Sequence, residues 1–224
     1  MNNFQSVGPN EPEEVLRLRS LKRALDASKE NPPDPKAVRP VIRPFNLGSA
    51  IPFYQFPCKD LFVLWVISSP SAVANFTDQI YITHAQETEL QRQGHSLPKL
   101  ALRNIFDMTG RKLSSHGRSD EAGRIVSLGL MHEDGYGPAR MLFHPYFERF
   151  FPEGYWIAVP GRSEAMAFSK TMTLEEKAEA EAMIRDYFAE GEGVCDRLLE
   201  PEDVAVPTSW LEDADKWFDE LRSS

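Results

Sequence analysis

The sequence predicts an α+β fold: a single mixed domain with a central, mainly antiparallel sheet, flanking helices and an N-terminal helical arm. Two observations lead to this class. Strand and helix patterns interleave without the regular alternation of a doubly wound α/β protein. No segment repeats at a fixed period. With 224 residues the chain can build one sizeable core. We expect residues 1–45 to form the arm and a linker, 46–206 the core domain, and 207–224 an acidic C-terminal helix.

The arm is predicted from residues 11–30, where apolar side chains recur at helical spacing after Asn10, an N-cap candidate. Its apolar stripe either packs back on the domain or captures a partner, and the sequence leaves both open. Residues 31–44 contain five prolines, which remove backbone donors and favour extended structure. We therefore expect this segment to be a linker or a strap over the core.

The first half of the core domain is predicted to hold three strands and a helix. Residues 51–58 and 61–68 are aromatic-rich and extended, and the second of them is apolar enough to be the central strand. Residues 71–76 favour a helical turn. A short strand over 79–83 and a helix over 84–92 complete this part of the chain.

The middle of the chain begins with a helix over residues 97–108, which Ser96 can cap. The polar residues 111–124 are typical of a loop, and residues 125–131 of a strand. Gly137 and Pro138 then open a short helix, which we expect to be interrupted near Pro145.

The last third contains a predicted hairpin, with strands at 155–159 and 165–168. Thr173 and Glu176 form a capping box for a long helix that follows. Apolar residues at helical spacing over 210–221 predict a final amphipathic helix.

Composition narrows the class of protein. The cysteines, Cys58 and Cys195, lack the spacing of a zinc site or a disulfide framework, so we expect reduced thiols. The longest apolar run, 61–67, is too short to cross a bilayer, and the N-terminus lacks signal-peptide character, so we expect a cytoplasmic protein without membrane association.

The acidity of the chain is concentrated near its C-terminus. The formal net charge is −9, yet residues 172–224 alone hold sixteen acidic and five basic side chains. Such a surface repels nucleic-acid phosphates and favours a basic protein partner. The alternative is a solvated helix face and tail that keep the protein soluble.

Catalytic motifs are not recognisable: the sequence has no GxSxG or SxxK nucleophile pattern and no glycine-rich phosphate loop. One polar cluster stands out as a candidate site, and its spacing matches no metal-binding motif. Its arginines can clamp an anion or can form ion pairs with Asp134, Glu148 or Glu164. The cluster comprises His132, Glu133, Asp134, Arg140 and Arg162.

Residues around this cluster also resemble a known family. Asp134 and Gly135, then 139–142, then 158–164 follow in order the Asp-Gly stretch, short helix and Ala-Val-Pro turn of the YtpQ-like family of bacterial proteins. Segments 61–77 and 97–106 resemble that family's apolar strand and Ala-Leu-x-Asn helix. The turn departs from the family pattern at Gly161 and Ser163. The resemblance spans about residues 61–206 and implies a fold rather than an activity, because the family's function is not established.

Three functional hypotheses follow. The first is a bacterial immunity protein, or antitoxin-like module, that blocks a basic effector without cofactor or metal. The second is a small enzyme or ligand-binding domain that uses the polar cluster, and the third is an adaptor. For the first hypothesis, the predicted partner-binding residues are Trp210, Glu212, Asp213, Asp215, Trp217 and Phe218.

Overall fold

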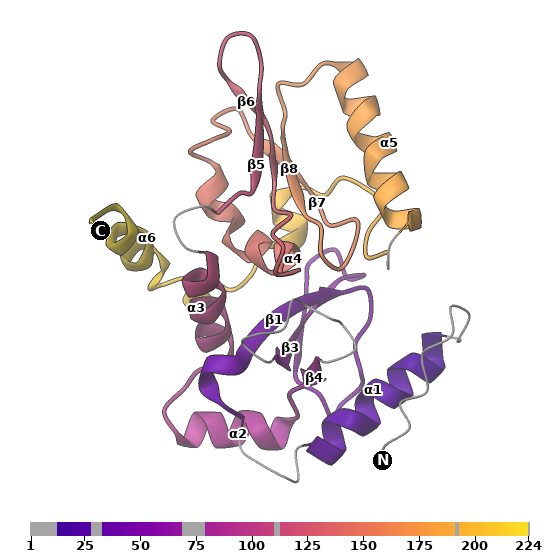
Figure 1. The fold of residues 1–224 in the computed structure, drawn as a ribbon, viewed down its shortest axis with the longest axis vertical. Helices are drawn as coiled ribbons and strands as arrows, with labels where there is room; N and C mark the ends of the chain where they lie inside the picture. The colour runs from indigo at the N-terminus through magenta and orange to yellow at the C-terminus, as the bar shows by residue number, and fades with distance from the viewer. Residues whose placement is uncertain (1–12, 28–32, 69–78, 110–112, 191–192, 224) are drawn as a thin grey trace.

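The computed structural model describes residues 13–27, 33–68, 79–109, 113–190 and 193–223, and contains two four-stranded antiparallel sheets (Figure 1). One hydrophobic cluster runs from Ala24 to Phe218 and includes residues of both sheets. The α+β class is confirmed. The strands, however, are divided between two sheets where we expected one central sheet.

The first sheet is built around β3 (Phe62–Ile67). β1 (Val38–Arg43) pairs along one side of it, while β2 (Phe53–Gln55) and β4 (Ile80–Tyr81) pair with successive parts of the other side. Since β3 has neighbours on both sides and is almost wholly buried, its predicted central position is confirmed.

Part of residues 31–44, predicted to be a linker or a strap over the core, forms the strand β1. All six of its residues are buried and pair with β3, with Pro40 opposite Trp65. The Ser68 N–H donates to the Ala37 carbonyl at 3.0 Å, and the alternation of an antiparallel ladder then turns the nitrogen of Pro40 away from β3. A proline at such an edge position removes no ladder bond. Residues 38–43 therefore belong to the first sheet.

The second sheet has the order β5 (His116–Ser119), β6 (Ile125–Gly129), β8 (Met166–Ser169) and β7 (Tyr155–Ala158). The β7–β8 hairpin and the strand β6 are confirmed. β5 lies where we expected a loop. All four of its residues are exposed, so it has no apolar alternation by which a sequence pattern could identify it.

Helices occupy most of the expected places. The capping box at Thr173 and Glu176 is present, with the Thr173 N–H bonded to the Glu176 carboxylate at 2.9 Å. Pro145 lies inside a 3₁₀ helix, η3 (Met141–Phe147), instead of interrupting the structure. The α-helices are α1 (Glu13–Ala27), α2 (His84–Arg92), α3 (Leu97–Thr109), α4 (Gly137–Arg140), α5 (Leu174–Glu190) and α6 (Ala214–Ser223).

Shorter 3₁₀ helices connect these elements: η1 (Pro35–Ala37), η4 (Pro201–Val204) and η5 (Thr208–Trp210). The final helix is thus shorter than predicted, because Trp210 belongs to η5 and α6 begins at Ala214. The predicted cap at Asn10 and the predicted turn over 71–76 lie outside the described residues.

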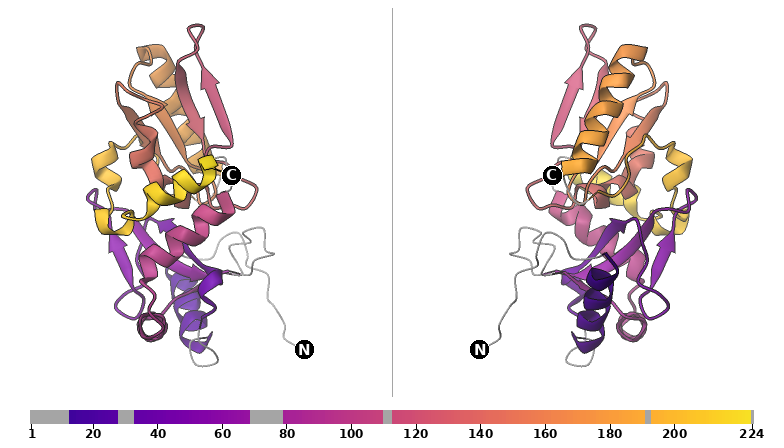
Figure 2. Two further views of the ribbon diagram at one scale, coloured as in Figure 1. Left: turned by 90° about the vertical axis from the view of Figure 1, so that its left-hand side faces the viewer. Right: turned by 90° about the vertical axis from the view of Figure 1, so that its right-hand side faces the viewer.

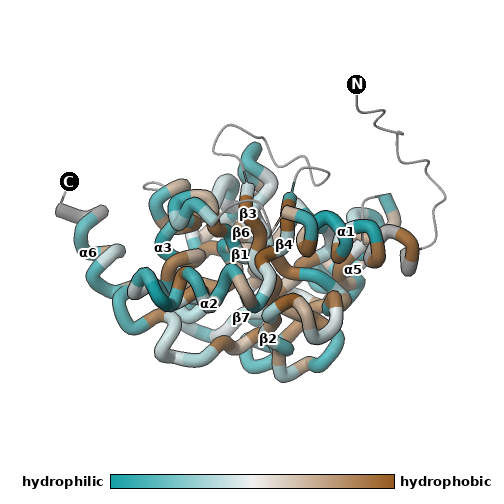
Figure 3. The backbone as a smooth tube through the Cα atoms, turned by 90° about the horizontal axis from the view of Figure 1, so that it is seen from below, coloured by the Kyte–Doolittle hydropathy of each residue, from teal (hydrophilic) through white to brown (hydrophobic). Residues whose placement is uncertain are grey.

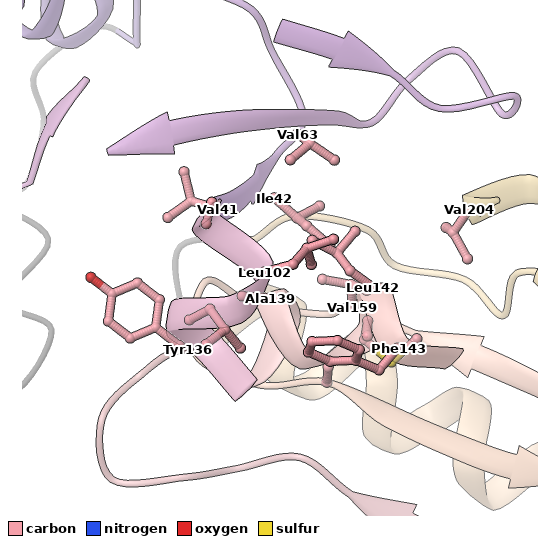
Figure 4. Packing of buried hydrophobic residues seen from close by; sticks show 14 of the residues in the cluster. Val41, Ile42, Val63, Leu102, Tyr136, Ala139, Leu142, Phe143, Val159 and Val204 are labelled. Carbon is pink, nitrogen blue, oxygen red and sulfur yellow. The ribbon is translucent and has the colours of Figure 1, made fainter. Parts of the chain in front are cut away.

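The main core fills the space between the two sheets. Ile42 and Val63 from the first sheet face Leu142 and Phe143, and Val159 comes from the chain that follows β7 (Figure 4). The apolar strand β3 lies inside, whereas α2 and α6 are largely hydrophilic (Figure 3). None of the described helices combines the length and apolar character needed to cross a membrane.

Candidate functional site

The aromatic residues predicted to anchor a partner belong to the protein's own core. Trp217 and Phe218 are 8% and 7% exposed. The Phe218 ring lies 5.0 Å from that of Phe106 and 4.3 Å from that of Tyr146, measured between centroids. Trp210 is half-buried and contacts Tyr54 at a centroid distance of 5.0 Å. These three rings pack the C-terminal segment against the rest of the domain.

The carboxylates of the same segment also have partners within the chain. Glu212 pairs with Lys99 of α3 at 2.7 Å, and Asp213 pairs with Lys216 at 3.2 Å. Asp215 accepts a hydrogen bond from the Tyr146 hydroxyl at 3.0 Å. Exposed pairs of this kind contribute only about 0.2–1 kcal/mol each. They nevertheless reduce the free negative charge that 207–224 presents to another protein.

The polar cluster contains one strong buried interaction. Arg140 is fully buried, and its two terminal nitrogens bind the two carboxylate oxygens of Asp134 at 2.8 and 2.5 Å. Its Nε donates to the Thr109 hydroxyl at 2.9 Å. Burial disfavours the charged form of Asp134, but hydrogen bonds from Arg140 and the Tyr136 N–H hold the pKa of this carboxyl below its ordinary value. Arg140 thus forms the ion pair with Asp134 that was one of its two predicted roles. Through Thr109, Arg140 also ties the turn at Asp134 and Gly135 to α3.

The other members of the cluster are less buried than Arg140. His132 Nε2 lies 3.2 Å from the Leu113 carbonyl, and burial, followed by the charge of Arg140, lowers the pKa of His132. Glu133 is exposed, and Arg162 is half-buried in the turn between β7 and β8. Within the described ranges, no group of three or more His, Cys, Asp or Glu side chains could hold a metal ion. The geometry gives His132 and Asp134 a common neighbour in Arg140.

A different acidic surface lies on α5. Glu179, Asp186 and Glu190 are exposed, and none of them has an ion-pair partner among the described residues. Together with Ala182, Met183 and Tyr187 they line an open groove of about 410 Å³. We call Glu179, Asp186 and Glu190 the α5 carboxylates. Their spacing of seven and four residues places them on one side of the helix.

Two neighbouring contacts orient this side of α5. Glu176 pairs with Arg118 of β5 at 3.2 Å, whereas the Lys177 ammonium lies 4.5 Å from the ring centroid of Trp156 in β7. Glu176 and Lys177 thus mark opposite flanks of the helix. Glu179 and Met183 follow Glu176 at helical spacing, so the groove lies on the flank that faces β5.

We expected partner binding at residues 210–218, and α5 carries further exposed carboxylates within the same acidic quarter of the chain. The signal was available in the spacing of Glu179, Asp186 and Glu190. Met183 and Tyr187, which lie beside these carboxylates, pack against the small core cluster under α5.

Comparison with known proteins gives no match: no family model fits the chain, and no curated protein or solved structure is similar to it. The resemblance to the YtpQ-like family therefore stays a prediction.

Proposed function

We propose that this protein is a non-catalytic binding module, of the kind represented by bacterial immunity proteins, that blocks a basic effector through the acidic flank of α5. The observation that carries the proposal is the row formed by Glu179, Asp186 and Glu190, whose charges have no ion-pair partner among the described residues. Carboxylates that lack internal partners are free to meet the cations of another protein.

Electrostatics support a basic partner over other ligands. Like charges along one flank create a field that speeds the approach of a cationic surface and repels phosphate backbones. The C-terminal segment contributes less to this field, because Glu212 and Asp213 are paired with lysines. The binding surface that we propose is therefore α5, in place of 207–224.

An enzymatic role for the polar cluster has weaker support. The charge of Arg140 is already neutralised by Asp134 in a two-point contact, so this arginine is committed to the fold. An anion would have to displace Asp134 to reach it. The contact favours a structural role for the pair.

The proposal is tested by charge reversal. The tagged protein is co-expressed with the product of the neighbouring gene, and the affinity of the purified complex is measured by titration calorimetry. Glu179→Lys with Asp186→Lys should weaken binding by ~1 kcal/mol per reversed charge, or roughly 30-fold together.

A matched control separates a local effect from net charge. Glu153→Lys with Glu202→Lys changes the total charge equally at exposed carboxylates outside α5. This control should shift the affinity by less than about threefold. Equal losses in both variants, or unchanged affinity in the α5 variant, would remove α5 from the interface.

A further inference from the structure

Half of one face of the second sheet is left open by α5. Ala180 and Ile184 of α5 pack against Met166 and Phe168 of β8 and against Ala158 at the end of β7. A helix about 10 Å wide covers roughly two strands spaced ~4.8 Å apart. The sheet is four strands wide, and the β5–β6 hairpin stands beside α5 in the right-hand view of Figure 2.

The open half is hollowed by small side chains. Strand register puts Ser127 and Gly129 of β6 between His116 and Arg118 of β5 on one side and β8 on the other. The hollow that results has a volume of about 290 Å³. Its apolar lining comprises Leu128, Met131, Met166, Phe168 and Met183. Methionine side chains are flexible and polarisable, and they line surfaces that adapt to varied apolar partners.

The hollow and the acidic groove form one continuous surface. Met183 lines both of them, so the apolar floor passes directly into the flank that carries the α5 carboxylates. At one end the ion pair between Arg118 and Glu176 bridges β5 and α5. The surface thus offers an apolar trough with carboxylates along its α5 side.

We propose that this trough seats a basic amphipathic helix of the partner, alongside α5, as a second helix on the sheet. Its apolar stripe fills the methionine-lined hollow, and its lysine and arginine side chains meet Glu179, Asp186 and Glu190. The width of the uncovered half-face selects a helix, and charge complementarity selects a basic one. The inference rests on the proposed function, because it describes the segment by which the basic partner binds.

Synthetic peptides test the trough without knowledge of the partner. The first probe is an 18-residue peptide of leucine and lysine, with leucines at helical i, i+3, i+4 and i+7 spacing. The second replaces each lysine by glutamate, and the third replaces each leucine by alanine. Affinities are measured by fluorescence anisotropy, and ¹⁵N–¹H spectra of the full-length protein locate the bound peptide.

The leucine–lysine peptide should bind at least tenfold more tightly than either relative and should shift amide signals in β5, β6 and α5, with α6 unchanged. Ser127→Leu, which fills the hollow, should weaken binding about tenfold. Ser209→Leu, at an exposed position of η5, is the matched control and should leave the affinity unchanged. The spectra of the unaltered protein decide the question even if Ser127→Leu fails to fold.

Other outcomes overturn the inference in distinguishable ways. Amide-signal shifts that are confined to the outer face of α5, with an affinity that Ser127→Leu does not change, would show that the peptide binds the acidic face of α5. They would contradict binding of a helix in the trough. Absence of binding by all three peptides would also overturn the inference that the trough seats a helix. The proposed function is tested separately, by the charge-reversal experiment on the natural complex. A concentration-dependent dimer that excludes the leucine–lysine peptide would assign the trough to a second copy of this chain.

Discussion

Replacing Asp134 with asparagine should destabilise the fold far more than a surface change. The substitution keeps the shape of the side chain but leaves the fully buried Arg140 guanidinium without a negative partner. Breaking a buried pair in this way costs about 3–5 kcal/mol. We take the lower end, ~3 kcal/mol, because the side chain of Asp134 is 26% exposed. For a chain of this length the expected fall in Tm is roughly 6–12 °C.

Chemical denaturation with a thermal melt measures this loss. A double variant, Asp134→Leu with Arg140→Leu, should be less destabilised than the sum of its single changes, because it buries no unpaired charge. The pKa of Asp134 is lowered in the folded protein, so its stabilising contribution is present above the ordinary carboxyl pKa and is lost as pH falls through the folded value. A loss below about 1 kcal/mol for Asp134→Asn would refute the reasoning.

Three further predictions concern the core and the C-terminal segment. Trp217→Ala should cost at least ~3 kcal/mol of unfolding free energy, because the ring is buried; denaturation that matches the unaltered protein would contradict this. Burial lowers the pKa of His144 to about 4, so the free energy of unfolding should fall as pH drops from about 6.5 towards 4. An NMR titration of His144 with a midpoint near 6.5 would contradict this prediction. Glu212→Gln, which weakens the exposed pair with Lys99, should change stability by less than ~1 kcal/mol, whereas a larger loss would mean that this pair holds α6 in place.

Sequence patterns predicted the elements whose local signals agree with their packing. α5 has a capping box and apolar spacing, and β3 has an apolar run long enough for a buried strand. β1 was missed because proline argues against a strand unless the strand is at an edge, and edge position is a tertiary property. β5 was missed for a related reason, since its four exposed residues include no large apolar side chain and give no periodicity.

The candidate site was harder to predict than the fold. Amphipathic spacing located the helix that contains Trp217 and Phe218, but spacing does not say whether a stripe covers its own core or another protein. In the structure it covers Phe106 and Tyr146. The pairing of Asp134 with Arg140 was one of two alternatives that the sequence left open. Only the packed structure shows which carboxylates keep unpaired charge.

The most direct test of the central claim is the salt dependence of partner binding, compared between the unaltered protein and Glu179→Lys with Asp186→Lys. If α5 supplies the acidic interface, the affinity of the unaltered protein should fall steeply between about 50 and about 300 mM salt. Over this range the Debye length shortens roughly 2.4-fold, because it varies as the inverse square root of ionic strength. The double variant should then show a flatter dependence. Identical slopes for the two proteins would mean that these carboxylates do not face the partner.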